Sequence, residues 1–215
     1  MDNEQLWDVV VDQRRRIADM LAQLSDSEWA TPSVCAEWTV KEVAAHVAIV
    51  PHGPSPWRMV PMILRARGDL DKVNRDIALT YSGSRTTGQL VAELRDTATS
   101  RLLPSVTTLK NLAMDIVVHG QDMAVPLGRD LPVGSTALVN ALDRAWTMGW
   151  PFHAQKELAQ FRLSATDVEW TVGQGTEVRG PGVALLFLVT RRVGAALPLL
   201  DAASAVAVRS LQRAR

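Results

Sequence analysis

An apolar helical run in the middle of the chain contains three ionisable side chains. The stretch Leu112–Gly128 reads LAMDIVVHGQDMAVPLG, starts with helical spacing, and includes Asp115, His119 and Asp122. Residues four apart lie one turn above each other on a helix, so Asp115 and His119 share a face. A carboxylate inside an apolar run is costly unless it is paired or coordinated. Any fold of this chain must therefore supply a partner for this face.

A second stretch provides a candidate partner. Thr39–Val50 reads TVKEVAAHVAIV, and Thr39 with Glu42 three residues later matches the capping box that starts a helix. Pro51 ends this helix, because a proline cannot continue the backbone hydrogen bonds. His46 lies inside the predicted helix, among alanines and valines. We therefore expect the two helices to pack together with His46 between them.

The resulting set has the composition of a catalytic zinc site. His46, Asp115 and His119 supply two imidazoles and one carboxylate, and catalytic zinc commonly has three such ligands and one open position. Asp122 is predicted to support His119 or to end the helix. A D-x-x-x-H spacing is frequent by chance, so the residues alone leave a second interpretation open. In that interpretation His46 is a core histidine and Asp115 belongs to a buried salt bridge or polar network.

Other candidates for the site are weaker. His52 and His153 lie near prolines in predicted loops, without partners on a helix face. Cys35 lies in the loop that precedes the second stretch, where it could be a soft ligand, a nucleophile or, as we favour, a small buried hydrophobe. Trp29 and Trp38 could wall the site or simply pack in the core, and simple packing is the stronger expectation.

Bulk composition excludes several classes of protein. The chain has 215 residues, 47% hydrophobic and 21% charged, as in a globular protein with a real core. Its 23 basic residues balance 23 acidic ones, so we expect no nucleic-acid partner. A single cysteine excludes an internal disulfide and suits the reducing cytoplasm. We see no secretory signal, and the apolar run Val183–Thr190 is too short for a bilayer, so we expect a buried helix there and no membrane partner.

Periodicity divides the chain into two predicted domains, a helical one over residues 1–150 and a small mixed α/β one over residues 155–215. Helices are expected at about 4–24, 39–50, 58–67, 70–81, 86–103, 107–125 and 134–150, with a kinked connection over 51–57. Short strands are expected at 161–165, 168–172 and 176–179, followed by helices over 181–192 and from 202 onward. In the first helix, the run Arg14–Arg16 is expected to face solvent.

Three stretches resemble one known family. Trp29–His46, WATPSVCAEWTVKEVAAH, is similar to the histidine-containing motif of the mycothiol-dependent maleylpyruvate isomerase family, within the DinB-like metalloenzyme superfamily. Asp115–Asp122, DIVVHGQD, resembles its second signature, a carboxylate four residues before the histidine of V-H-G-x-D. FRLSATDVEWTV and GPGVALLFLVTRR resemble the small α/β domain of the family, so the resemblance covers nearly the whole chain.

The resemblance implies a mainly α fold, a DinB-like up-down four-helix bundle followed by a small α/β C-terminal domain. It also implies a divalent metal, usually zinc, bound by His46, Asp115 and His119. Two positions depart from the family. Glutamate usually stands at Asp115, so the shorter side chain calls for closer helices or a bridging water. T-G-R usually stands at Thr190–Arg192, where Arg192 would be the family arginine near the thiol and the substrate.

The implied activity is thiol chemistry. Mycothiol, the low-molecular-weight thiol of actinobacteria, would bind the open position of the zinc as thiolate and add to an electrophilic carbon such as the alkene of maleylpyruvate. Rotation and loss of the thiol would give the trans isomer, whereas related members transfer the thiol to other electrophiles. A nearby arginine would steady the substrate carboxylates or an enolate. The resemblance thus implies a cytoplasmic isomerase or transferase, monomer or homodimer, with a small-molecule thiol and an electrophile as partners. The alternative is a non-catalytic metal-binding stress or regulatory protein of the same fold.

Overall fold

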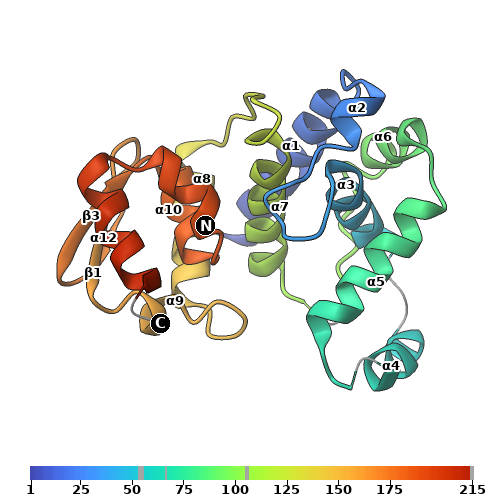
Figure 1. Cartoon of the computed structure of the whole chain (residues 1–215). Helices are drawn as coiled ribbons and strands as arrows, with labels where there is room; N and C mark the ends of the chain where they lie inside the picture. Colours follow the sequence, from blue (N-terminus) through green and yellow to red (C-terminus); the bar gives the residue numbers. More distant parts are fainter. Residues whose placement is uncertain (53–55, 66, 105–106, 214–215) are drawn as a thin grey trace. The chain divides into compact units, whose positions relative to one another are not determined.

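The protein divides into two compact units, Met1–Leu131 and Pro132–Arg215, in the computed structural model (Figure 1). The structure describes residues 1–52, 56–65, 67–104 and 107–213, so the predicted connection over 51–57 lies partly outside the described residues. These residues are mainly helical, with a three-stranded sheet in the second unit. The predicted mainly α composition with a small C-terminal sheet is therefore confirmed.

The elements follow one another along the two units as follows. The first unit contains α1 (Asn3–Leu21), α2 (Asp26–Trp29), α3 (Val40–Ile49), a 3₁₀ turn (Val50–His52), α4 (Pro56–Arg65), α5 (Leu70–Gly83), α6 (Thr87–Asp96) and α7 (Leu109–Ala124). The second contains α8 (Ser135–Thr147), α9 (Ala154–Glu157), β1 (Phe161–Ala165), β2 (Thr171–Gly173), β3 (Thr176–Gly180), α10 (Gly182–Val189), α11 (Val193–Ala196), a 3₁₀ turn (Leu197–Leu199) and α12 (Ala202–Arg213).

The helices that carry the candidate ligands begin where the sequence indicates. The predicted capping box of α3 is present, and in it the backbone N–H of Thr39 donates to Glu42 Oε2 at 2.6 Å. The Thr39 hydroxyl also contacts this oxygen. Helix α7 starts after Thr108, whose hydroxyl accepts the backbone N–H of Asn111 at 3.2 Å. Because each cap fixes the first turn, it also fixes which side chains of α3 and α7 face inward.

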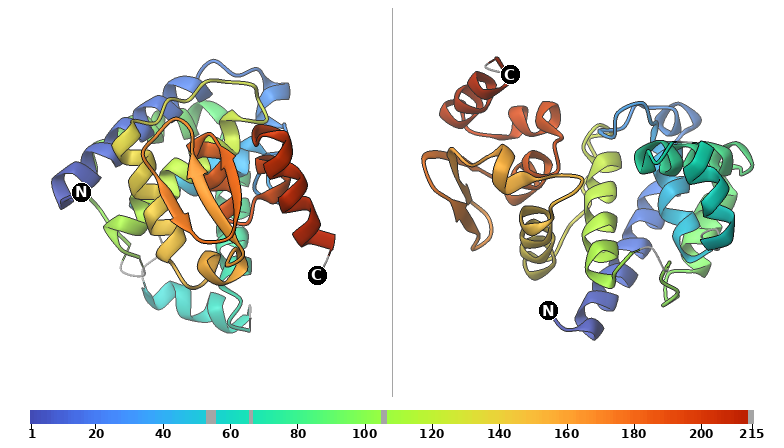
Figure 2. Two further views of the ribbon diagram at one scale, coloured as in Figure 1. Left: turned by 90° about the vertical axis from the view of Figure 1, so that its left-hand side faces the viewer. Right: turned by 90° about the horizontal axis from the view of Figure 1, so that it is seen from below.

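Four helices of the first unit form a closed ring of neighbours. Helix α1 packs against α6 and α7, and α3 packs against the same two helices, while α5 covers α3 (Figure 1 and Figure 2, right). Fully buried apolar side chains fill the space between them, among them Leu6, Val43, Leu90 and Val117. Burial of such side chains stabilises each by roughly 1.5–3 kcal/mol. The contact between α3 and α7 is the one that positions the candidate site.

Arg14 departs from the expectation that the run Arg14–Arg16 faces solvent. Its residue exposure is 1%, whereas Arg15 and Arg16 are exposed. The reason is helical periodicity, because Arg14 follows the buried Val10 by four residues and lies on the same stripe of α1.

The buried guanidinium explains why α6 ends earlier than predicted. Arg14 Nη1 donates to the backbone oxygens of Thr97 at 3.1 Å and Ser100 at 2.8 Å. Both carbonyls follow the end of α6 at Asp96, where the negative end of the helix dipole favours a cation. A helix continuing to residue 103 would use the Thr97 carbonyl within its own ladder. The predicted end of this helix at residue 103 was therefore wrong by about two turns.

The C-terminal sheet has β1 in the middle, antiparallel to β2 and parallel to β3. Leu163 of β1 is buried and pairs with Val172 on one side and Val178 on the other. The predicted strands at 161–165 and 176–179 are confirmed, whereas β2 is shorter and lies later than the predicted 168–172. Helix α12 packs against β3 (Figure 2, left).

Helix α10 is the apolar centre of this second unit. It contacts β1, β3, α8 and α11, and Ala184–Val189 are at most 2% exposed, as predicted for a buried helix. A Cβ at Gly182 would lie 2.7 Å from Leu138 Cδ2 of α8, so the two helices meet closely. Helix α8 thus groups with the C-terminal unit, which begins at Pro132. Within the described part of the chain, no helix combines the length and apolar character needed to cross a membrane.

The end of α10 is a Schellman motif with arginine in the glycine position. The backbone N–H of Arg192 donates to Phe187 O at 2.7 Å, and that of Arg191 donates to Leu188 O at 3.2 Å. Arg191 has φ 67°, a left-handed conformation that a side chain disfavours. This conformation is a physical reason for the glycine of the family's T-G-R pattern.

Replacing Arg14 tests the role of the buried guanidinium. We expect Arg14→Ala to lower the free energy of unfolding by about 3 kcal/mol, because two hydrogen bonds and a buried side chain are lost. Arg15→Ala, at the exposed neighbouring position, is the control and should change it by less than about 0.5 kcal/mol. Urea unfolding measures both. Equal stabilities for the two variants would show that Arg14 does not hold the segment after α6.

Replacing Arg191 tests the strain at the end of α10. Arg191→Gly should raise the free energy of unfolding by about 1 kcal/mol, since glycine adopts the left-handed conformation without a steric penalty. Arg191→Ala removes the same side chain but keeps a Cβ, so it should give no such gain. Thermal or urea unfolding compares the two, and an equal effect of glycine and alanine would contradict the explanation.

Candidate metal centre

The structure brings together the three side chains that the sequence proposes as metal ligands. His46 comes from α3, and Asp115 and His119 come from adjacent turns of α7, which packs against α3. One potential ligand atom from each residue lies within 4.8 Å of the other two. We call these three residues the His46 cluster.

The spacing in the His46 cluster suits a bound metal ion as well as an ion pair. His46 Nε2 lies 3.4 Å from Asp115 Oδ2, and His119 Nε2 lies 3.4 Å from Asp115 Oδ1. These separations exceed the ~2.7–3.2 Å of a good hydrogen bond. Two ligand atoms about 2.0–2.1 Å from a zinc ion at a tetrahedral angle lie roughly 3.3–3.4 Å apart. Both nitrogen–oxygen separations therefore fit a shared tetrahedral ion.

Asp122 orients His119 from the other side of the ring. Its carboxylate is fully buried and lies 2.9 Å from His119 Nδ1, so Nδ1 carries the proton that is shared with it. The other ring nitrogen, Nε2, then faces Asp115 with its lone pair when the imidazole is neutral. A carboxylate that fixes the tautomer of a histidine in this way is typical of metal-binding histidines.

The charges in this cluster shift two pKa values. Burial by itself would lower the pKa of His119, but the carboxylates of Asp115 and Asp122 outweigh burial and raise that pKa to about 9. Burial would likewise raise the pKa of Asp115, but His119 and His46 outweigh it and lower that pKa below its ordinary value. Without a metal, an ionised Asp115 thus faces a protonated His119.

Trp38 packs on both imidazoles. Its ring centroid lies 5.4 Å from that of His46 and 6.2 Å from that of His119, and the latter pair is stacked. Trp38 is itself buried. From the sequence, simple packing in the core was the stronger expectation for Trp38. The only sequence signal for its contact with the two imidazoles is its position directly before the capping residue Thr39. The indole restricts how the two rings can turn.

The His46 cluster is open to solvent through its carboxylate. The side chain of Asp115 is 37% exposed, compared with 17% for His46 and 10% for His119. A ligand in a fourth position therefore has a route to the cluster from the Asp115 side. This combination of buried imidazoles and an accessible carboxylate suits a site that takes up small molecules.

The remaining candidates lie elsewhere. His52 and His153 are exposed, and neither belongs to a cluster of possible ligands among the described residues. Cys35 is half-buried and forms a cluster with His119 and Asp122. Arg192 lies in the C-terminal unit, where Nη1 donates to Thr190 O at 3.1 Å, and its role in a reaction stays a prediction.

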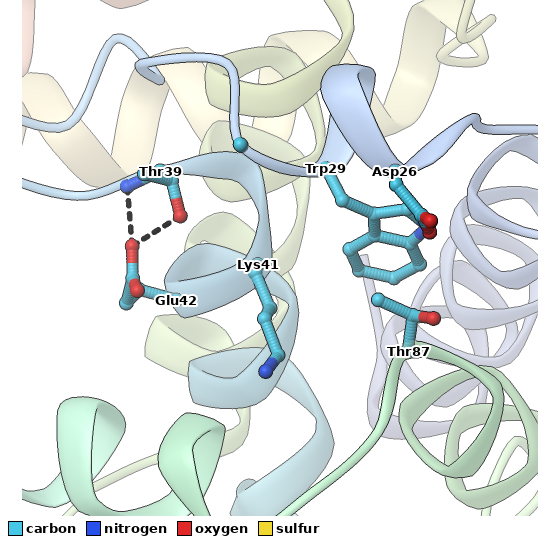
Figure 3. Close-up of a pocket in the computed structure, with 7 residues that line it drawn as sticks. Asp26, Trp29, Thr39, Lys41, Glu42 and Thr87 are labelled. Carbon is cyan, nitrogen blue, oxygen red and sulfur yellow. Dashed lines mark hydrogen bonds between the residues drawn. The ribbon is translucent and has the colours of Figure 1, made fainter.

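A pocket of about 290 Å³ lies between the short helix α2 and the first turns of α3 and α6 (Figure 3). Its lining residues are Asp26, Trp29, Ala30, Thr39, Lys41, Glu42 and Thr87. None of them belongs to the His46 cluster. Trp29, considered as a wall of the metal site, lines this pocket.

A comparison with models of protein families gives one match. Residues 10–102 match the mycothiol maleylpyruvate isomerase N-terminal domain, a span that includes His46 and ends before Asp115 and His119. No curated protein matches, and no solved structure matches. This match supports the resemblance to the mycothiol maleylpyruvate isomerase family over the N-terminal part of the chain.

Proposed function

We propose that the protein is a zinc- and mycothiol-dependent enzyme of the maleylpyruvate isomerase type. The metal site in this proposal is supported by the pair of 3.4 Å separations that join Asp115 to His46 and His119, and the thiol chemistry by the family match over residues 10–102. Its substrate class is an electrophilic small molecule, which would undergo cis–trans isomerisation or accept the thiol. A reduced thiol cosubstrate suits a cytoplasmic location. The ring of α1, α3, α6 and α7 would correspond to the four helices of a DinB-like bundle.

The residues of the site have separate tasks in this proposal. His46, Asp115 and His119 would hold the zinc ion, which when bound makes a coordinated thiol acidic enough to react as thiolate. Asp122 keeps a proton on His119 Nδ1 and so presents Nε2 toward Asp115. Trp38 limits the rotation of both imidazoles and keeps water from one side of them.

Asp115 in place of the glutamate of the family does not call for a bridging water. Each of its oxygens already faces one imidazole nitrogen at the same distance, 3.4 Å. Helices α3 and α7 pack directly against each other, which supports direct ligation by the shorter side chain. We therefore keep Asp115 as the carboxylate ligand.

Zinc binding by single-site variants is the first test. We expect His46→Ala, His119→Ala and the isosteric Asp115→Asn each to weaken zinc binding by more than about 100-fold, because each removes one ligand. His52→Ala is the matched control, since His52 is an exposed histidine just after α3. Zinc affinity is measured by competition with a chelator, and each variant's melting temperature is recorded without metal.

Activity is tested on the zinc-loaded wild type with mycothiol and a panel of electrophiles that includes maleylpyruvate. The proposal requires that at least one electrophile is consumed in a thiol-dependent reaction and that this consumption is lost in His119→Ala. Arg192→Lys is measured in the same assay to test the predicted role of Arg192. Zinc affinity unchanged in His46→Ala and His119→Ala would refute the site. Tight zinc binding without any consumption would favour a non-catalytic metal-binding stress or regulatory protein.

The pH dependence of zinc binding follows from His119. In the metal-free protein its pKa is raised to about 9, so the protonated form predominates below that pH and zinc must displace a proton. Affinity should rise by up to about tenfold per pH unit and level off above about pH 9. Chelator competition between about pH 6.5 and 9.5, corrected for the chelator's own titration, measures this. A profile that is flat over this range would contradict the proton displacement.

A further inference from the structure

A second group of possible ligands shares His119 with the His46 cluster. Cys35, His119 and Asp122 each offer one potential ligand atom, and these atoms lie within 4.8 Å of one another. Asp122 is fully buried, His119 is 8% exposed and Cys35 is half-buried. We call these three residues the Cys35 cluster.

The backbone holds Cys35 in this place. The loop that carries it is tied to α7 by the N–H of Val34, which donates to the backbone oxygen of Asp122 at 3.0 Å. The hydroxyl of Ser33 donates to the backbone oxygens of Cys35 at 3.1 Å and Trp38 at 2.9 Å. The loop is therefore anchored at Asp122, the residue that supplies the carboxylate. This anchor keeps the sulfur of Cys35 close to the carboxylate and to the imidazole of His119.

The arrangement fits metal binding better than nucleophilic catalysis. In a nucleophile–histidine–carboxylate triad the imidazole lies between the other two groups. Here the sulfur lies within 4.8 Å of a carboxylate oxygen as well as of a ring nitrogen, so the imidazole does not separate the other two groups. Thiolate, imidazole and carboxylate are all ligands of zinc-like ions, and sulfur favours the softer ones.

We propose that the Cys35 cluster is a second metal position, selective for thiophilic divalent ions such as Cd²⁺, which competes with the His46 cluster for His119. Binding would form bonds from the metal to the Cys35 sulfur and to His119 Nδ1, and it would release the thiol proton and the Nδ1 proton to solvent. Ligand atoms about 2.0–2.3 Å from one tetrahedral ion lie roughly 3.3–3.8 Å apart, so the sulfur has to move in by up to about 1 Å. The short loop after α2 allows this shift more readily than a helix would.

Competition follows from the chemistry of one imidazole. His119 Nδ1 lies 2.9 Å from Asp122, and Nε2 lies 3.4 Å from Asp115. A neutral imidazole has a lone pair on only one ring nitrogen. An ion in the Cys35 cluster takes the lone pair at Nδ1 and leaves the proton on Nε2, so the His46 cluster loses a ligand. By linkage, each ion weakens the binding of the other by the same factor.

The test titrates the metal-free full-length protein with Cd²⁺ and follows thiolate-to-cadmium charge-transfer absorption. Because Cys35 is the only cysteine, this absorption reports on one residue. We expect the wild type and His46→Ala to show it, and Cys35→Ser to lack it and to bind Cd²⁺ at least about tenfold more weakly. Saturating zinc should weaken Cd²⁺ binding in the wild type but not in His46→Ala.

A second measurement needs no variant. Iodoacetamide alkylation of Cys35, followed by mass spectrometry, should slow by at least about tenfold when Cd²⁺ is bound. Absence of both the absorption and this protection would overturn the second position. Loss of the absorption in His46→Ala would also overturn it, because the sulfur would then belong to the first site. Zinc affinity of Cys35→Ser should match the wild type, so a failure of the second position is distinguishable from a failure of the zinc site.

Discussion

One carboxylate between two imidazoles defines the contact of α3 with α7. Asp115 faces His46 of the neighbouring helix with one oxygen and His119 of its own helix with the other. An ionised group at such an interface is costly unless it is compensated. A protonated His119, held in that state by Asp115 and Asp122, compensates it in the metal-free protein. The two capped helices around this cluster must keep their register, since a shift of one residue would turn Asp115 away.

The loop between α2 and α3 is the second constraint on the site. Pro32 pairs with Thr39 in an isolated bridge, and Val34 binds the backbone of Asp122. The same short segment therefore starts α3, places the indole of Trp38 over the imidazoles, and brings Cys35 to the end of α7. Local hydrogen bonds of the loop, and not only the packing of helices, determine the environment of His119.

Local signals predicted much of this arrangement. Capping residues such as Thr39 and the i,i+4 spacing of Asp115 and His119 act within one helix, so they are readable from the sequence. Arg14 shows where local prediction fails. Its charged neighbours predicted exposure to solvent, whereas its position on the apolar face of α1 buries it. Its partners are backbone oxygens 83 and 86 residues away. No local pattern reports such a partner, and the early end of α6 was missed for the same reason.

The contacts around His119 could likewise be predicted only in part from the sequence. The sequence could propose Asp122 as support, but not that its buried carboxylate binds Nδ1 at 2.9 Å. The place of Cys35 depends on how the loop closes onto α7, which residue spacing does not encode. Contacts between distant segments decide both cases. The metal-ligand hypothesis came from residue spacing and a family resemblance, and the 3.4 Å separations between Asp115 and the two imidazoles support it.

Charge balance explains why the proposed site would prefer a thiolate. In the metal-free protein the negative charge of Asp115 is balanced by one proton on His119. A divalent ion that displaces this proton brings one positive charge more than it removes. An anionic ligand in the open position returns the partly buried site to the net charge that it has in the metal-free protein, where a change of buried charge is costly. A neutral thiol that loses its proton on binding is such a ligand. Asp122 adds the same negative charge in each of these states, and its hydrogen bond to Nδ1 strengthens the basicity of the imidazole that faces the ion.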